Sequence, residues 1–265
     1  MLDIASFLAL GLVAGLLAGM LGIGGGVVIV PALIWIFQHQ GLPGEIIPHL
    51  AVGTSLGSIV FTSLSAILAQ HRRRAIDWSV VRLLAPATLL GGFASGSLAG
   101  YIPADVLKGL FAVFLLLVGT QFIFDWKPAP HWRLPGRVGL WGSGLGIGSL
   151  SALLGIGGGN ITVPFLHACN MELKRAIAIS TTLGFPIAVF GAAGFILSGW
   201  SQAALPPDSL GYISLPALAA IAACSILLAP LGVRLSHDLP VKNIKRIFGG
   251  LVLVISLRML WNVFL

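Results

Sequence analysis

The sequence predicts an all-α polytopic membrane protein made of two inverted repeats, and three observations lead to this fold class. Of the 265 residues, 57% are hydrophobic and 9% are charged, whereas a soluble domain carries about 25% charged residues because its surface faces water. Apolar runs of about 20 residues, the length that crosses a bilayer, recur along the chain. A glycine-rich motif occurs twice. The composition excludes a soluble enzyme and a nucleic-acid binder, although the net charge is +7.

The first half is expected to hold one interrupted apolar stretch and three full spans. The stretch at 4–37 is too long for one span, because a helix rises about 1.5 Å per residue. Its middle carries Gly24, Gly25 and Gly26, and consecutive glycines weaken a helix and let the backbone turn. We therefore predict two shorter segments joined at these glycines, followed by spans at 50–70, 79–100 and 106–124.

The second half repeats this order. Its long stretch at 138–168 is interrupted by Gly157, Gly158 and Gly159, and the spans that follow lie at 176–197, 213–235 and 244–264. The polar segment between the halves is too short for a soluble domain. We therefore expect a first transmembrane repeat at 1–126, a cytoplasmic linker at 127–137 and a second transmembrane repeat at 138–265.

The two interrupted stretches are similar residue by residue. The segment Leu21–Pro31 reads LGIGGGVVIVP, and Leu154–Pro164 reads LGIGGGNITVP. The similarity continues in the following spans, where Ala51–Gly57 parallels Ala178–Gly184. Interrupted segments at matching places in two halves point to the binding site of a transporter. Asn160 is polar where the first copy has a valine, which indicates an asymmetry between the halves.

The basic residues predict how the halves are oriented, because cytoplasmic loops are enriched in Lys and Arg. If each interrupted stretch returns to its starting side, one side receives all basic residues except Lys108 and Arg258, a split of 13 to 2. If each stretch crosses once, the split is 8 to 7. The returning arrangement gives each half an odd number of crossings and so inverts one half relative to the other. The N-terminal segment carries no basic residue, so the return of the first stretch is inferred from its likeness to the second.

The interrupted stretches suit an anion. A broken helix offers unpaired backbone N–H groups and the positive end of its dipole, and glycines let a ligand approach the backbone closely. Hydroxyl groups on the neighbouring spans can donate further hydrogen bonds. The alternative interpretation is that the glycines allow tight packing and the hydroxyls join helices. The predicted substrate-binding residues are Gly24, Gly25, Gly26, Thr54, Ser55, Gly157, Gly158, Gly159, Asn160, Ser180, Thr181 and Thr182.

Charged residues narrow the substrate class. Every Asp and Glu falls at the end of a predicted span or in a loop, which argues against a cation carrier with a carboxylate at mid-membrane. We expect neither a metal site nor a cofactor. His49, just before a span, is the candidate for a titrating group, with a capping or interfacial role as the alternative. The run Arg72–Arg74 is interpreted as an anchor at anionic lipid headgroups, with attraction of anions as the alternative.

Two further features are interpreted as structural, and a third is considered as a possible enzyme motif. Arg258 is expected to extend from the last span to the membrane interface. Glycines spaced by four residues, at 11, 15 and 19 and at 92, 96 and 100, predict close helix contacts. The segment Gly53–Gly57 fits G-x-S-x-G, but an apolar span lacks the strand-turn-helix context of a nucleophile elbow.

The doubled LGIGGG-x-x-x-VP motif resembles the TauE/SafE family of sulfite and organosulfonate exporters, as does the basic loop His71–Trp78 that ends in Asp-Trp. The resemblance runs from about residue 11 to 260 and implies passage of small sulfur-containing or carboxylate anions through the cytoplasmic (inner) membrane. We expect a secondary transporter of sulfite or sulfonates with export as the favoured direction. An anion channel of the same fold, a carboxylate carrier and an intramembrane hydrolase are the alternatives. The expected partners are a small anion and membrane lipid but no nucleic acid, and a homo-oligomer stays open.

Overall fold

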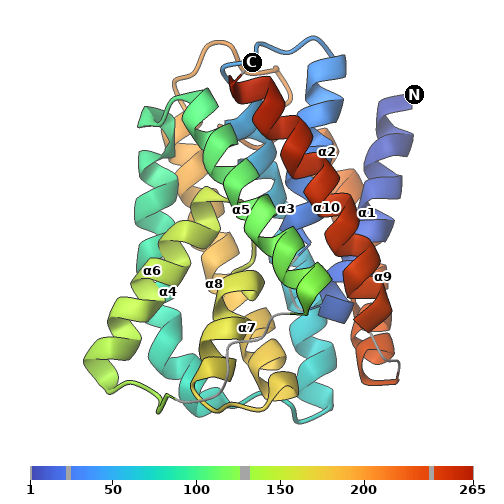
Figure 1. Ribbon diagram of the computed structural model, residues 1–265. Coiled ribbons are helices and arrows are strands. Elements are labelled where there is room, and N and C mark those ends of the chain that lie inside the picture. The colour runs from blue at the N-terminus through green and yellow to red at the C-terminus, as the bar shows by residue number, and fades with distance from the viewer. Residues whose placement is uncertain (1, 22–24, 126–131, 239–241, 265) are drawn as a thin grey trace.

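The computed structural model describes residues 2–21, 25–125, 132–238 and 242–264, and the regular elements in these ranges are helices (Figure 1). The first half holds α1 (Leu2–Leu21), α2 (Gly26–His39), α3 (Ile47–Arg72), α4 (Trp78–Leu98), the short 3₁₀ helix η1 (Ala99–Tyr101) and α5 (Ala104–Phe124). The second half holds α6 (Arg137–Leu153), α7 (Gly159–Ala168), α8 (Leu173–Gly199), α9 (Leu215–Asp238) and α10 (Lys242–Phe264). The predicted all-α fold class is confirmed for the described part of the chain.

Five described helices are long and apolar enough to cross a membrane. They are α3, α4 together with η1, α5, α8 and α9 over its residues 215–235. They coincide with five of the six predicted spans. The sixth prediction, at 244–264, falls on α10, which is also a helix over this range.

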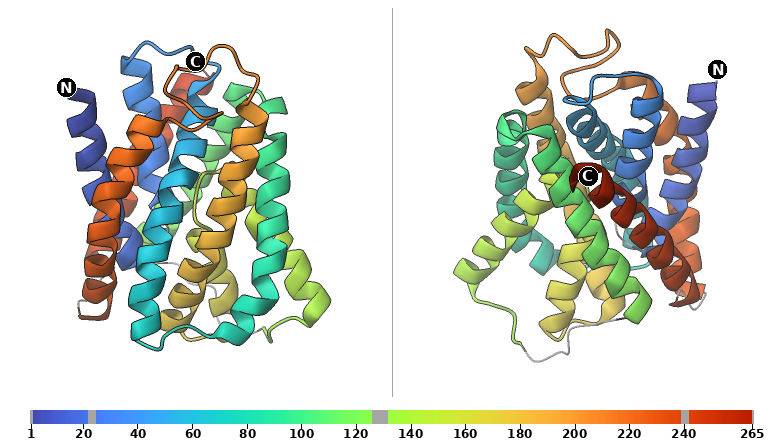
Figure 2. Two further views of the ribbon diagram at one scale, coloured as in Figure 1. Left: turned by 180° about the vertical axis from the view of Figure 1, so that it is seen from behind. Right: turned by 45° about the horizontal axis from the view of Figure 1, so that its top comes forward.

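Both long apolar stretches are divided into two helices at their glycines, as predicted. The helix α2 begins after Gly25 and α7 begins after Gly158, and both glycines have left-handed backbone angles, with φ of 78° and 77°. Only glycine adopts this conformation without a steric cost. In each stretch the second helix runs back toward the end of the bundle from which the first one came (Figures 1 and 2).

Many of the basic residues gather at one end of the helix bundle. The ends of α3, α5, α7 and α9 lie at one end of the bundle together with the starts of α4, α6, α8 and α10 (Figure 1). This end carries Arg72–Arg74, Arg137, Lys174 and Arg175, and we call it the basic end. The opposite end holds the start of α1, the end of α10 and the loops at 40–46 and 200–214 (Figure 2).

Glycines bring the helix axes close together, as their spacing predicts. Gly11, Gly15 and Gly19 of α1 lie against the backbone of α9, and a methyl group at Gly15 would lie 2.6 Å from the Ser225 Cα atom. The glycines at 92 and 96 on α4 and at 100 on η1 lie against α8 in the same way. Equivalent contacts join α6 to α4, where Gly148 faces the Thr88 backbone. The helices α3 and α8 are the most buried of the five candidate spans and lie in the middle of the bundle.

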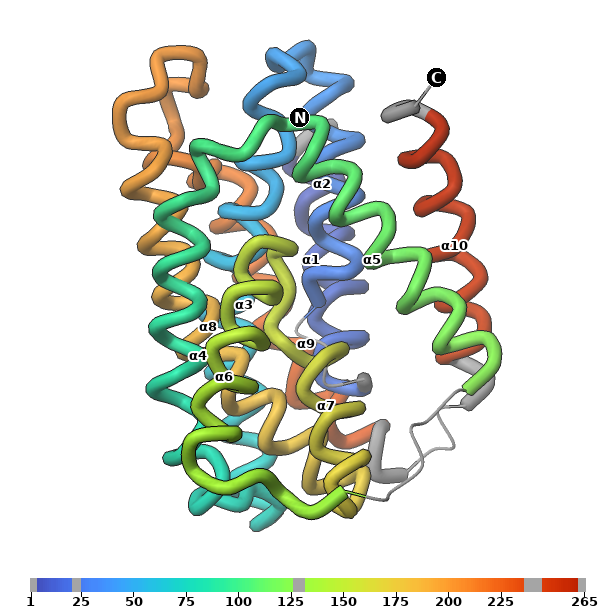
Figure 3. The backbone as a smooth tube through the Cα atoms, turned by 60° about the vertical axis from the view of Figure 1, so that its left-hand side comes forward, coloured from blue at the N-terminus to red at the C-terminus, as the bar shows by residue number. Residues whose placement is uncertain are grey.

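The last helices of the two halves, α5 and α10, pack on each other along one side of the bundle (Figure 3). Gly119 and Gly249 face each other where these helices meet. The Ser256 hydroxyl donates a hydrogen bond to the Ala112 carbonyl oxygen over 2.8 Å and fixes the pair. This pair forms one wall of a cavity described below.

Candidate anion-binding site

The two glycine breaks meet inside the bundle. A methyl group at Gly26 would collide with the Gly155 carbonyl oxygen and would lie 2.9 Å from the Ile156 Cα atom. Gly155 has a left-handed φ of 64° and packs on the Val52 backbone of α3. The Ser55 hydroxyl of α3 donates a hydrogen bond to the Gly155 carbonyl oxygen over 2.7 Å. Residues 100 or more positions apart in the sequence therefore form one junction.

Both helices that leave the breaks point their N-terminal ends at this junction. Their capping residues are Gly25 and Gly158, which offer no side chain to the first N–H groups of α2 and α7. The first N–H groups of a helix have no partner within the helix, and its N-terminus carries a partial positive charge. Such an end is a ready binding site for an anion. Of the predicted glycines, Gly24 lies outside the described residues.

The second break also holds a cluster of unpartnered polar atoms. Within the described residues, the hydroxyls of Ser151, Thr162 and Ser180 and the Asn160 Nδ2 atom are buried and have no hydrogen-bond partner. These residues are at most 8% exposed. A methyl group at Gly158 would lie 3.4 Å from both the Ser151 and the Thr162 hydroxyl oxygen, so these two hydroxyls lie beside this glycine. Each buried donor or acceptor without a partner costs about 1–3 kcal/mol, so such a cluster calls for a bound molecule.

The first break is apolar at the equivalent positions. Ala18 occupies the place of Ser151, Val27 that of Asn160, Ile29 that of Thr162 and Gly53 that of Ser180. Of these differences, the one at Asn160 was predicted from the sequence, whereas those at Ser151 and Thr162 were missed. The signal was present, because each is a polar residue where the other copy is apolar.

The other predicted hydroxyls have partners in the protein. The Thr54 oxygen accepts a hydrogen bond from the Ser214 backbone N–H over 2.9 Å. Thr181 and Thr182 each donate to a carbonyl oxygen four residues earlier on α8, over 2.8 Å. A hydroxyl has one hydrogen to donate, so these two groups and Ser55 would have to give up an existing bond to bind an anion. Among the five predicted hydroxyls, Ser180 is the one whose oxygen is unpartnered in the described structure.

A small cavity of about 10 Å³ lies beside the second break. Gly157, Thr181 and Gly184 line it together with residues of α3 such as Thr62. A water molecule needs about 10–15 Å³, so the space is too small for an oxyanion. In this conformation the break is closed on its α3 side.

The surroundings of the junction are free of described carboxylates. The acidic side chains that the structure describes lie in loops or at helix ends, namely Glu45, Asp77, Asp105, Asp125, Glu172 and Asp208. The same part of the chain shows no group of His, Cys, Asp and Glu that could hold a metal ion. His49 lies nearly two turns before Ser55, where its Nε2–H donates to the Ala99 and Ile102 carbonyl oxygens over 3.1 and 3.0 Å. It ties α3 to the turn before α5.

The enzyme-like motif is part of a buried helix. Gly53–Gly57 lies inside α3 rather than between a strand and a helix. The hydroxyl hydrogen of Ser55 is used by the Gly155 carbonyl oxygen. The two histidines of α3, His49 and His71, lie near its opposite ends. This geometry does not form a nucleophile and base pair, which requires side chains within hydrogen-bond reach.

Comparison with known proteins shows the family of the chain. The family model described as "Sulfite exporter TauE/SafE" matches residues 7–259. A probable membrane transporter protein of Haemophilus influenzae is 35% identical over 95% of this chain and 96% of its own length. A probable membrane transporter protein of Methanocaldococcus jannaschii is 28% identical over 94% of this chain and 92% of its own. No solved structure matches the chain. The chain therefore belongs to the TauE/SafE family and is a multi-pass membrane transporter.

Proposed function

We propose that this protein is a secondary transporter that exports small sulfur-containing anions, such as sulfite or a sulfonate, across the cytoplasmic membrane. The observation that carries the proposal is the set of buried, unpartnered polar atoms on α6, α7 and α8, from Ser151, Asn160, Thr162 and Ser180, of which the Ser151 and Thr162 hydroxyls lie beside Gly158. Oxyanions accept hydrogen bonds with every oxygen, and this cluster offers three hydroxyls, an amide and the first N–H groups of α7. The family description supports sulfite as the first anion to test.

The electrostatics of the cluster favour an anion over a cation. Charge-assisted hydrogen bonds are about twice as strong as neutral ones, and water cannot compete at a buried site. Donors placed without a neighbouring carboxylate stabilise negative charge and repel none. A cation carrier would need acidic groups at this depth instead.

We propose that residues 1–126 and 138–265 form two inverted repeats, joined by the segment 127–137. Movement of these repeats against each other would open the site alternately to the two sides of the membrane. The support is that equivalent helices run in opposite directions, with α1 descending from the opposite end and α6 rising from the basic end (Figures 1 and 2). Rocking of one half against the other would open the junction of the breaks to each side in turn. The basic end would face the cytoplasm.

Single cysteines test this orientation, after Cys169 and Cys224 have been replaced. A side chain at either Gly44 or Gly136 would find open space, so Gly44→Cys and Gly136→Cys should leave the fold intact. Because α3, α4 and α5 lie between these positions, we expect an impermeant thiol reagent to label position 44 from outside intact cells and position 136 only after permeabilisation. Labelling of both from the same side would contradict the proposed repeats.

The transport proposal is tested by uptake of labelled sulfite into proteoliposomes, with sulfoacetate and taurine as competitors and with or without a pH gradient. We expect saturable uptake that a gradient drives uphill. Flux that never saturates and cannot be driven uphill would instead identify a channel. Competition by simple carboxylates alone would identify a carboxylate carrier.

Two serines of α6 provide a matched pair for the site. Ser151→Ala removes an unpartnered buried hydroxyl and restores the residue of the first copy, whereas Ser143→Ala removes an exposed hydroxyl that bonds within its own helix. Loss of a hydrogen bond to a charged group costs about 1.5–3 kcal/mol, so we expect Ser151→Ala to lower sulfite affinity by about tenfold or more. Ser143→Ala should behave as wild type. Equal affinities for the two variants would remove the cluster as the binding site.

A further inference from the structure

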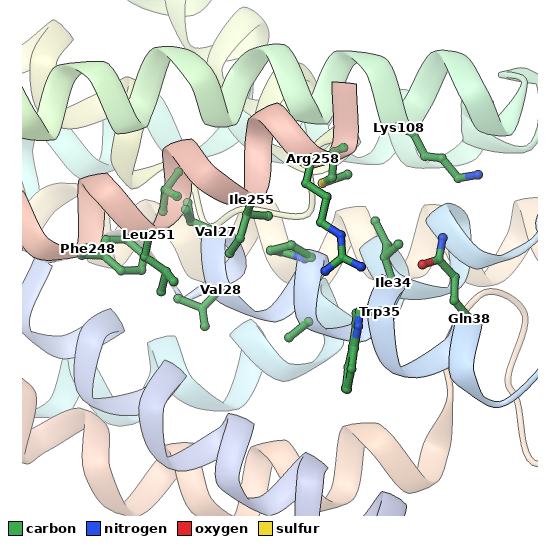
Figure 4. Close-up of a pocket in the computed structure, with 14 residues that line it drawn as sticks. Val27, Val28, Ile34, Trp35, Gln38, Lys108, Phe248, Leu251, Ile255 and Arg258 are labelled. Atoms are coloured by element: carbon green, nitrogen blue, oxygen red, sulfur yellow. The ribbon is translucent and has the colours of Figure 1, made fainter. Parts of the chain in front are cut away.

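A cavity of about 400 Å³ lies between α2, α5 and α10 (Figure 4). Its wall is mostly apolar, with Val28 of α2 and Phe248 and Ile255 of α10 among the lining residues. Its polar side chains are Gln38, Lys108 and Arg258. Pockets that bury an organic ligand have volumes of about 300–1,000 Å³ and combine apolar walls with a few polar groups.

The two cations of the cavity come from different halves of the chain. Lys108 of α5 and Arg258 of α10 are 150 residues apart, and they are the two basic residues that sequence analysis placed on the charge-poor side of the membrane. Figure 4 shows the Arg258 side chain extending toward Trp35 and Ile34 of α2. The sequence predicts that this arginine extends to the membrane interface, and in the structure it lines the cavity.

The cavity carries a net positive charge. Among the described residues that line it, none is acidic. Asp105 lies 3.5 Å from the Lys108 ammonium nitrogen, but its side chain is 82% exposed, whereas that of Lys108 is 19% exposed. Exposed ion pairs of this kind contribute little, so the lysine charge remains available to a ligand.

The inner wall of the cavity adjoins the first glycine break. Val27 lines the cavity, and it follows directly after Gly26, the residue that touches the second break. The cavity therefore extends from the cations to the residue that adjoins the first break.

We propose that this cavity is the outer binding site of the transport path and that it takes an organic anion with an apolar body, such as an alkanesulfonate, rather than an inorganic oxyanion. This inference rests on the proposed transport function for the role of the site, but binding itself is independent of transport. Lys108 and Arg258 hold the charged head group, and Val28, Phe248 and Ile255 cover the apolar body. An inorganic anion of a few atoms would bind at the cationic end of the cavity and leave these apolar walls uncovered.

Calorimetric titration of the protein in nanodiscs of zwitterionic lipid tests the proposal, with methanesulfonate, butanesulfonate and octanesulfonate as probes. Each buried methylene contributes about 0.8 kcal/mol, so we expect affinity to rise by up to about fourfold per carbon until the cavity is filled. Equal binding of methanesulfonate, sulfite and octanesulfonate would overturn the proposal. Octanol, which has the same chain without the charge, should bind far more weakly than octanesulfonate.

Charge variants test whether binding depends on the two cations of the cavity or on the overall charge of the protein. We expect Lys108→Gln and Arg258→Gln each to weaken octanesulfonate binding by about tenfold, which is the effect of losing one hydrogen bond to a charged group. Arg137→Gln removes an exposed cation at the basic end and should leave binding unchanged. A uniform loss among the three variants would show that the effect is one of overall charge and would refute the assignment.

The headgroup of an anionic lipid is the alternative ligand of this cavity, and a second experiment distinguishes it from an organic anion. If nanodiscs with anionic lipid abolish octanesulfonate binding and native mass spectrometry finds a retained anionic lipid that Arg258→Gln releases, the cavity is a lipid site and the proposal is wrong. Octanesulfonate binding that persists in these nanodiscs supports it. A protein that binds octanesulfonate here but transports no anion would refute the proposed function and keep the binding site.

Discussion

Gly26→Ala tests whether the contact between the two breaks holds the protein together. Gly26 is the first residue of α2, and its backbone is not left-handed, so alanine itself is compatible with the local conformation. The added methyl group would nevertheless collide with the Gly155 carbonyl oxygen and approach the Ile156 Cα atom to 2.9 Å. Both obstacles are backbone atoms, which cannot move aside as a flexible side chain can.

The expected magnitude combines two opposing effects. Forcing extra atoms into a packed interior costs about 1–3 kcal/mol, whereas replacing glycine by alanine in a helix gains about 0.5–1 kcal/mol. Because the collision is with backbone on two residues, we expect a net destabilisation of about 1–2 kcal/mol. The control is Gly146→Ala on α6, where an added methyl group meets nothing within 4 Å. That change should stabilise the protein by the gain of about 0.5–1 kcal/mol that alanine brings to a helix, with no opposing collision.

Two measurements test this prediction. One is thermal unfolding in detergent, and the other is the uptake of sulfite. A loss of about 1–2 kcal/mol corresponds to a fall in Tm of a few degrees for a chain of this size. Uptake should fall more strongly, because separating the breaks displaces the N-termini of α2 and α7. If Gly26→Ala matches Gly146→Ala in both Tm and uptake, the breaks do not meet as described and the reasoning fails.

Two further predictions concern single hydrogen bonds. The pKa of the Asp77 carboxyl is held below its ordinary value of 3.8, chiefly by a hydrogen bond from the Ser79 hydroxyl. The carboxylate therefore stabilises the start of α4 at neutral pH. This stabilisation is lost as the pH falls through the lowered pKa. Asp77→Asn retains a capping oxygen, and the wild-type Tm should therefore fall relative to that of the variant below about pH 4. Ser55→Ala leaves the buried Gly155 carbonyl without its side-chain donor and should cost about 1–3 kcal/mol by thermal unfolding, whereas Ser58→Ala, which loses a bond within its own helix, should cost less.

Local chemistry explains what could be predicted. Both glycine breaks were predicted because each apolar stretch is too long for one span and consecutive glycines weaken a helix; the structure adds that Gly25 and Gly158 have left-handed φ of 78° and 77°. The close helix contacts followed from the spacing of four residues that places Gly11, Gly15 and Gly19 on one face of α1. These features depend on neighbours in the sequence, so the sequence contains them.

The partners of the hydroxyl groups were harder to predict. Thr181 and Thr182 donate back to their own helix, an arrangement that short hydroxyl side chains favour in any apolar helix. Treating them as free donors overlooked this local competitor. Ser55, in contrast, bonds to a carbonyl oxygen 100 residues away, which no local rule indicates.

The sequence alone determined the membrane class, the helix content, the two breaks and the family, because composition, apolar length and glycine conformation are local properties. Only the tertiary structure decided that Gly26 meets Gly155, that Ser151 and Thr162 lie beside Gly158, and that two distant cations share one cavity. Each of these depends on which helices cross and at what depth. Helix crossings are set by packing among all the helices together, and a pattern read along one helix does not contain them.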